Sequence, residues 1–387
     1  MKPFHFSAQR TIGTVSSCFV LIAWLLGNVH GVAYTNDSLH FAASGHSFWH
    51  NGTWIDANGA RLTHWQPLYP TVLGLFLKHD SGVFVLHLLC LICFIYGTWR
   101  LIRLWQLSAW CYVAIVCHPM VLTAFSFVWT EALALPLFVW FLWGYERLRL
   151  YTGAQRLPVF LLLVALIWCR FSFLPPIYAL LLWDIYHFQQ TKQLRLAWLL
   201  LAVSLLAVFA WVAYAYLLQG GMLENYGMWQ ANWLNTLILY MQAWGNYFLP
   251  SATVVLLPVA AIISIIAFVQ RLIKLPDAFF PRRLAAAAGA CFLFLLMVNI
   301  QSYDDQLRYL LPVWLCFVPA VGNLCPTASR SKVWHVVLIT WLLGTAARSL
   351  HAAFFWQHIR QSASIIEQPL IRNHTKELLS KASVHKR

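Results

Sequence analysis

The chain has 387 residues, of which 61% are hydrophobic and only 10% are charged. Soluble domains carry about 25% charged residues and a smaller apolar fraction, so this composition excludes a soluble enzyme and a nucleic-acid-binding domain. It predicts an all-α, multi-pass membrane protein. The 26 Lys and Arg outnumber the 12 Asp and Glu, as expected of cytoplasmic loops that contact anionic membrane lipids.

The chain begins with an apolar run at 14–33 that predicts a first membrane span. We interpret it as an uncleaved span, because no small-residue cleavage site follows it. The next segment, 34–80, is predicted to be the first outer loop. It contains the apolar stretch 67–77, which is too short to cross a hydrocarbon core of about 30 Å and so predicts a re-entrant or interfacial segment.

The remaining apolar runs bring the predicted total to about eleven transmembrane helices. They fall near 81–99, 108–126, 130–146, 157–171, 173–187, 195–218, 250–271, 284–303, 308–325 and 333–352. The segment 219–249, rich in aromatic and amide residues, is predicted to be a second long outer loop whose aromatic side chains favour an interfacial belt. Residues 1–355 are expected to form one membrane domain, followed by a polar, basic tail at 356–387.

The distribution of basic residues predicts the orientation. With the N-terminus in the cytoplasm and 67–77 returning to the outer side, most Lys and Arg fall in cytoplasmic loops. The predicted outer loops hold only Arg61, Lys78, Arg170 and Arg308. If 67–77 crossed the membrane, the later loops would invert, so this bias supports re-entry.

Charged residues near the outer ends of spans are candidates for a functional site, because burying them in the membrane without a partner costs several kcal/mol. They are Asp37, Glu131, Arg170, Asp304, Asp305 and Arg308. Simpler roles are also open. Asp37 and Glu131 suit helix N-termini, Arg170 suits a lipid-headgroup contact, and the turn at 303–308 suits exposure to water.

Five short blocks resemble motifs of the GT-C glycosyltransferases, in the same order along the chain. The likeness is greatest to the branch of protein mannosyltransferases and lipid A aminoarabinose transferases (glycosyltransferase family 39 and relatives). The blocks are Asp37-Ser38, Pro67-Leu68-Tyr69-Pro70, Thr130-Glu131, Arg170-Phe171, and Arg308-Tyr309 with Pro312. The resemblance covers about residues 1–325, but a D-x-D motif in the first loop and a large outer domain after the last span are missing.

This resemblance implies an inverting enzyme that moves a sugar from a polyprenyl-phosphate donor to a lipid, glycan or protein acceptor at the outer face. Asp37 would be the base or the ligand of an assisting divalent cation, and Glu131 would orient the acceptor or the partner of Asp37. Arg308 and Arg170 would hold the donor phosphate. The substrate pocket would be lined by His64, Gln66, Tyr69 and Tyr309. The expected location is a bacterial inner membrane, with the site facing the periplasm.

A fixed metal site is not predicted. Four histidines lie in the first outer loop beside Asp37, but their spacing matches no known ligand pattern. They are His40, His46, His50 and His64.

Two other functions are open to this sequence. A transporter or flippase would show broken spans at matching positions in two halves, and Pro136 and 175–176 interrupt apolar runs without such matches. A Cys-dependent transpeptidase would use Cys169, beside Arg170. Most of the nine Cys lie in apolar runs, however, and are typical of packing residues.

Overall fold

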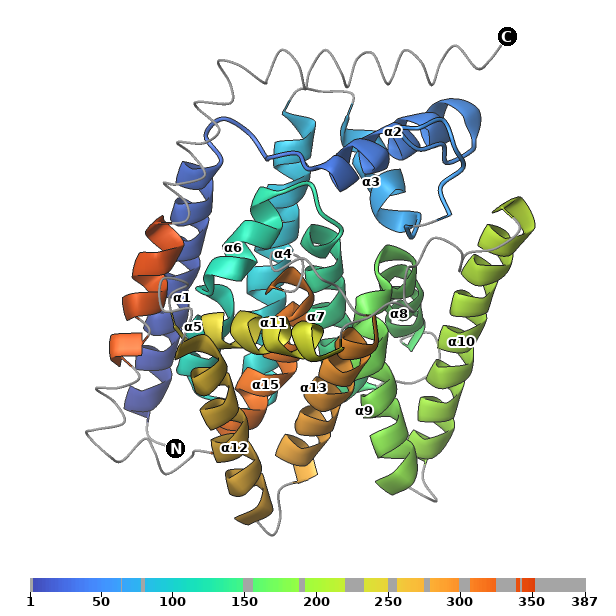
Figure 1. The fold of residues 1–387 in the computed structure, drawn as a ribbon. Coiled ribbons are helices and arrows are strands. Elements are labelled where there is room, and N and C mark those ends of the chain that lie inside the picture. Colours follow the sequence, from blue (N-terminus) through green and yellow to red (C-terminus); the bar gives the residue numbers. More distant parts are fainter. Residues whose placement is uncertain are drawn as a thin grey trace.

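The structure, a computed structural model, describes residues 3–63, 65–77, 81–148, 156–187, 192–219, 233–249, 256–274, 279–298, 307–324, 339–341 and 343–351. Nearly all of these residues are helical, and within these ranges strand pairing is limited to two isolated bridges. Most of the long helices run along one direction, and α2 and α3 lie across one end of them (Figure 1). The predicted all-α class is confirmed.

The first half of the chain contains seven labelled helices. They are α1 (Pro3–Gly27), α2 (Asn36–Asn51), α3 (Leu68–Phe76), α4 (Gly82–Leu104), α5 (Ala109–Val116), α6 (Pro119–Ser126) and α7 (Glu131–Arg147). The second half continues with α8 (Leu157–Cys169), the short 3-10 helix η2 (Phe171–Phe173), α9 (Leu174–His187), α10 (Lys192–Gln219), α11 (Trp233–Asn246), α12 (Leu257–Lys274), α13 (Phe279–Val298) and α15 (Leu311–Leu324).

Four of the described helices are long and apolar enough to cross a membrane. They cover Gln9–Gly27, Gly82–Leu104, Leu194–Leu217 and Phe280–Met297. The bent pair α5–α6 passes the same test as a unit, and parts of α8, α12 and α15 are shorter apolar helices. The chain is therefore a multi-pass integral membrane protein. The total of about eleven spans stays a prediction, as does the boundary between 1–355 and 356–387, because 352–387 lie outside the described residues.

The predicted single span at 108–126 consists of two helices that meet at 46°. Pro119 disfavours helical geometry at the residue before it, and His118 accordingly adopts an extended backbone with ψ of 133°. The His118 ring nitrogen Nδ1 accepts a hydrogen bond from the backbone N–H of Met120 at 3.2 Å, which caps α6. Pro119 is visible in the sequence, but the apolar composition of 108–126 does not reveal that the helix breaks there.

The predicted outer segment 219–249 contains α11, which lies across the neighbouring helices (Figure 1). Its aromatic side chains Tyr240 and Trp244 are buried, as is Tyr247 just after it. Trp244 contacts Trp314 edge-on, with ring centroids 5.9 Å apart. These three aromatic residues belong to the core, so the expected interfacial belt is wrong for them, because Tyr240 packs on α13 and the other two pack on α15.

Within 34–80, predicted to be the first outer loop, α2 and α3 form a compact layer. The nine residues of α3 span about 14 Å at 1.5 Å per residue, which is too short to cross the membrane and agrees with the expected interfacial or re-entrant segment. Gly45 of α2 and Gly74 of α3 let the two backbones touch. A Cβ at Gly45 would lie 2.2 Å from the carbonyl oxygen of Pro70, so no larger residue fits there without moving the helices.

At the opposite end of the bundle, a buried arginine joins three helices. Arg283 of α13 is only 2% exposed and contacts Glu146 of α7 and Asp184 of α9. The Tyr145 hydroxyl donates to the same Asp184 carboxylate at 2.6 Å. Glu146 and Asp184 therefore share one specific cationic partner.

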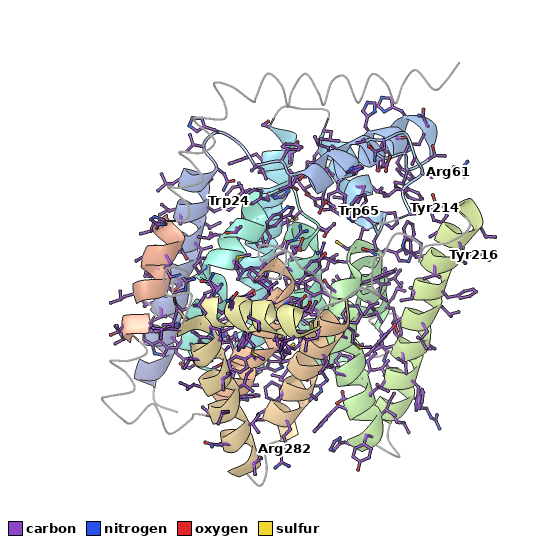
Figure 2. All side chains as sticks on the ribbon, in the orientation of Figure 1. Trp24, Arg61, Trp65, Tyr214, Tyr216 and Arg282 are labelled. Carbon is purple, nitrogen blue, oxygen red and sulfur yellow. The ribbon has the colours of Figure 1, made fainter. Side chains whose placement is uncertain are left out.

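We expect Arg283→Ala to lower the free energy of unfolding by about 3–5 kcal/mol, because it leaves the buried Asp184 and the partly buried Glu146 without their cation. Denaturant unfolding of the detergent-solubilised protein, followed by tryptophan fluorescence, measures this loss. Arg282→Ala is the matched control, since Arg282 lies at the end of the bundle (Figure 2) and is more exposed. Equal losses for the two variants would contradict the assignment.

Candidate active site

The N-terminus of α2 positions the first candidate carboxylate, Asp37. The Thr35 backbone N–H donates to the Ser38 hydroxyl oxygen at 2.8 Å, which begins the helix with a local cap. Asp37 lies in the first turn, where the helix dipole favours a negative charge. Its side chain is 33% exposed, so it is more accessible than the other charged groups of the site.

Backbone and side-chain hydrogen bonds hold this helix start against the segment before α7. Ala33 pairs in parallel with Phe127, with the Ala33 N–H donating to the Ser126 carbonyl at 2.9 Å. The Ser38 hydroxyl donates to the carbonyl of Val128 at 2.9 Å. Segments about 90 residues apart in sequence are thereby fixed side by side, and this brings Asp37 close to Glu131.

Glu131 is the first residue of α7 and is only 1% exposed. Its burial requires cationic partners, because an isolated buried carboxylate is costly. The structure provides two, Arg170 and Arg308. The Thr130 hydroxyl also donates to the Glu131 carboxylate at 3.3 Å.

Arg170 reaches the site because α8 ends at Cys169 and the chain turns into η2. Its Nη2 lies 2.9 Å from Glu131 Oε1, and its Nη1 donates to the Thr130 hydroxyl. Its Nε donates to the Ser172 hydroxyl at 3.2 Å. The snorkelling role that the sequence left open does not describe this residue, which is 8% exposed and binds groups inside the protein.

Arg308 links the two carboxylates. Its Nη2 lies 3.2 Å from Asp37 Oδ2, and its Nε lies 3.7 Å from Glu131 Oε1. The guanidinium carbon lies 4.7 Å from the ring centroid of Trp129, a cation–π contact. Arg308 is 5% exposed, so Trp129 and the two acids stabilise its charge in place of water.

Four charged residues predicted separately from sequence thus form one continuous network, which we call the acid–arginine network. It consists of Asp37, Glu131, Arg170 and Arg308. Its two acids and two arginines balance in formal charge. Tyr309 lies beside it, with the Arg170 guanidinium carbon 4.4 Å from its ring centroid, as expected for a residue near the site.

The predicted pocket-lining residues of the first outer loop differ in position. Gln66 is buried, with 9% exposure. Tyr69 is fully buried, and its hydroxyl forms a 2.9 Å hydrogen bond with Nε2 of His87 on α4. This hydrogen bond joins α3 to α4, so Tyr69 has a structural role. Substrate contact by Gln66 and Tyr69 stays a prediction, and His64 lies outside the described residues.

The sequence also offered Cys169 and the acidic pair at 304–305 as candidates for a functional role. Cys169 is fully buried, and its thiol donates to the carbonyl of Thr130 at 3.5 Å. This environment fits a packing residue beside the network and does not favour the transpeptidase alternative. Asp304 and Asp305 lie outside the described residues.

Three of the four histidines in the predicted cluster contact other protein groups. His40 Nδ1 lies 3.5 Å from Asp56 Oδ2, and the rings of His46 and His50 stack 4.0 Å apart. Burial, with the nearby His50, lowers the pKa of His46. Within the described part of the chain, no three His, Cys, Asp or Glu side chains are grouped as a metal site would require.

The two arginines are held in place by Trp129, Thr130 and Ser172. The sequence alone assigned no role to Trp129 or Ser172. Thr130 was noted only as part of the Thr-Glu block. Trp129 and Ser172 were missed, although each lies within two residues of a predicted charged residue. That proximity was the only available signal, because polar and aromatic residues are common throughout this chain.

Comparison with known proteins supports the same architecture. No protein-family model and no curated protein matches the sequence. Solved structures do match, and they share the fold of this chain. One of them is the crystal structure of the aminoarabinose transferase ArnT from Cupriavidus metallidurans in the apo state. Its TM-score is 0.53 at 12% sequence identity, and the match covers 96% of this chain and 77% of that chain.

A pH-dependent contribution to stability is expected from Asp56 in the first outer loop. Burial raises the pKa of this carboxyl, but hydrogen bonds from His40 and from the backbone N–H groups of Ala60 and Asn58 outweigh it, so the pKa lies below its usual 3.8. A depressed pKa stabilises the fold above the unfolded value, and this stabilisation is lost as the pH falls through the folded value.

The test compares the melting temperatures of the wild type and Asp56→Asn. We expect a constant difference above about pH 5 that shrinks as the pH falls below 3.8. A difference that grows on acidification would contradict this linkage.

Proposed function

We propose that this protein is a glycosyltransferase that moves a sugar from a polyprenyl-phosphate donor to an acceptor hydroxyl, with inversion at the anomeric carbon. The observation that carries the proposal is the acid–arginine network, in which two arginines, a buried carboxylate and a partly exposed carboxylate converge from four segments. It occurs in a fold shared with the aminoarabinose transferase ArnT. Such a network is costly in a membrane protein, which favours a functional role over a purely structural one.

The two arginines suit the departing phosphate. As the bond between the anomeric carbon and the phosphate oxygen breaks, negative charge grows on that oxygen, and guanidinium donors that are already oriented stabilise it. Glu131, Thr130 and Ser172 fix the Arg170 guanidinium. Trp129 lies against that of Arg308. Both cations are therefore held before the donor arrives.

Asp37 suits the role of general base. It is the accessible member of the network, at 33% exposure, whereas Glu131 is at 1%. In the proposed step the acceptor oxygen bonds to the anomeric carbon and its proton passes to Asp37. The phosphate leaves with the bonding electron pair. Glu131, buried between both arginines, is then a positioning residue for these cations.

The described residues do not fit a divalent cation at Asp37. Its carboxylate already faces a guanidinium at 3.2 Å, and the nearest histidine of the predicted cluster, His40, pairs with Asp56. A second cation would be repelled by Arg308. We therefore assign Asp37 the role of base, and no step of the proposal passes through a metal.

The proposed location is a bacterial inner membrane, with the network facing the periplasm. The positive-inside rule supports this orientation, because Glu131 begins α7 and Arg147 lies in the last turn of the same helix. The acceptor is a lipid, glycan or protein hydroxyl that reaches the first outer loop.

Asp37→Asn is expected to reduce sugar transfer about 10²- to 10⁴-fold, the usual contribution of a general base. A radiolabelled polyprenyl-phosphate sugar and a membrane extract as acceptor source would measure this. The matched control is Asp56→Asn, the same substitution in the same outer loop, which should retain most activity. Unchanged transfer by Asp37→Asn would refute its role as the base.

Arg308→Ala is expected to weaken donor binding about 10- to 100-fold, the value of one charge-assisted hydrogen bond. Arg308→Lys keeps the positive charge and should fall between the wild type and the alanine variant. The KM for the donor is the measurement, and the exposed Arg61→Ala is the control. If Arg308→Ala and Arg61→Ala raise the KM for the donor equally, the phosphate role of Arg308 is wrong.

A further inference from the structure

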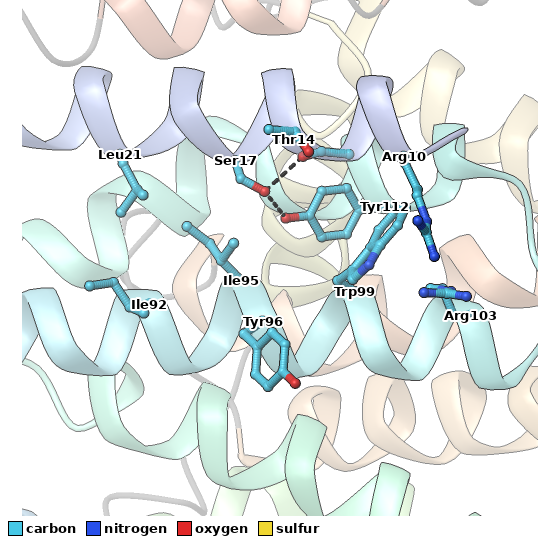
Figure 3. Close-up of a pocket in the computed structure, with 11 residues that line it drawn as sticks. Arg10, Thr14, Ser17, Leu21, Ile92, Ile95, Tyr96, Trp99, Arg103 and Tyr112 are labelled. Carbon is cyan, nitrogen blue, oxygen red and sulfur yellow. Dashed lines mark hydrogen bonds between the residues drawn. The ribbon is translucent and has the colours of Figure 1, made fainter. Parts of the chain in front are cut away.

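A second candidate binding site lies away from the acid–arginine network. It is a groove of about 360 Å³ between α1 and α4, closed at the back by Tyr112 of α5 (Figure 3). It follows the half of α1 nearer the N-terminus and the half of α4 nearer the C-terminus. These helix ends lie at the end of the bundle opposite α2 and α3 (Figure 1). Neither the predicted site residues nor the proposed reaction uses this groove.

The floor of the groove is built by side chains that are themselves fixed. Gly13 lets the Trp99 ring lie against α1, because a Cβ at Gly13 would be 2.6 Å from that ring. Trp99 meets Tyr112 edge-on at 5.2 Å. The Tyr112 hydroxyl shares a 2.6 Å hydrogen bond with Ser17, which also bonds to the Gly13 carbonyl. The groove is therefore a shaped site and not a loose gap between helices.

One end of the groove is strongly basic. Arg10 of α1 and Arg103 of α4 both line it, and Figure 3 shows their guanidinium groups at the same end. No Asp or Glu is among its lining residues. Two guanidinium groups at the same end of a groove attract an anion that can reach both. A phosphate group is the anion that paired guanidinium groups bind best.

The rest of the groove is apolar and has the depth of one membrane leaflet. Leu21 of α1 and Ile92 of α4 line its far end. Each lies eleven residues from the arginine on its own helix, which corresponds to about 16 Å at 1.5 Å per residue. The hydrocarbon core is about 30 Å thick, so the groove extends roughly to the bilayer midplane.

We infer that this groove binds one anionic phospholipid of the cytoplasmic leaflet. Arg10 and Arg103 hold its phosphate at the membrane surface, and an acyl chain lies along Leu21, Ile92 and Ile95. The exposed ring of Tyr96, at 50% exposure, flanks the chain on the bilayer side. This inference does not depend on the proposed function, because the two sites share no residue.

The test is lipid retention by the full-length protein in native mass spectrometry. The protein is reconstituted in nanodiscs of phosphatidylcholine with phosphatidylglycerol and then released in a mild detergent. We expect one phosphatidylglycerol to remain bound to the wild type. Arg10→Gln with Arg103→Gln should weaken its apparent affinity at least tenfold, as should Thr14→Trp, which fills the groove without changing its charge.

The control is the double variant Arg147→Gln with Arg282→Gln, which removes the same charge from arginines that do not line the groove. It should change affinity less than twofold. Equal loss in both double variants would overturn the inference in favour of general surface charge. So would full competition by inorganic phosphate, which would make the site one for a free anion. Tryptophan fluorescence melting confirms that each variant is folded before it is compared.

Discussion

The burial of Glu131 is the constraint on which the acid–arginine network and the segments that carry it depend. A carboxylate with 1% exposure at the start of a membrane helix must be neutralised, and two arginines from distant parts of the chain do this. Arg170 reaches it because α8 stops and turns, and Arg308 reaches it from the segment just before α15. The folding of four separate segments is therefore coupled to one charge.

The two ends of the molecule handle charge in similar ways. At one end, Arg283 binds Glu146 and Asp184 and joins α7, α9 and α13. At the other, Arg308 binds Asp37 and Glu131. The first cluster lies among three packed helices, and its most exposed side chain, that of Glu146, is 18% exposed. In the second cluster the Asp37 side chain is 33% exposed and reaches solvent. Because α7 carries a charged residue of both clusters, its position is fixed at both ends.

The sequence predicted the class of fold and the four charged residues because each depends on local information. Apolar composition identifies spans, and a charge in an apolar context is conspicuous. The break before Pro119 and the burial of α11 were not predicted, because both depend on what packs against those segments. The partners of each charge were also beyond the sequence. Arg308 pairs with Asp37, 271 positions away, and the Ala33–Phe127 bridge that places Asp37 near Glu131 has no sequence pattern of its own.

The balance of the acid–arginine network has a consequence for turnover. Under the proposed reaction, a donor phosphodiester brings one negative charge, and transfer moves a proton onto Asp37 while the phosphate gains a charge. The net charge of the site is the same before and after the chemical step. The net charge of the site therefore changes only when the phosphate product leaves and Asp37 releases its proton. The one-third exposure of Asp37 lets that proton pass to water, so the site is reset from its solvent-facing side.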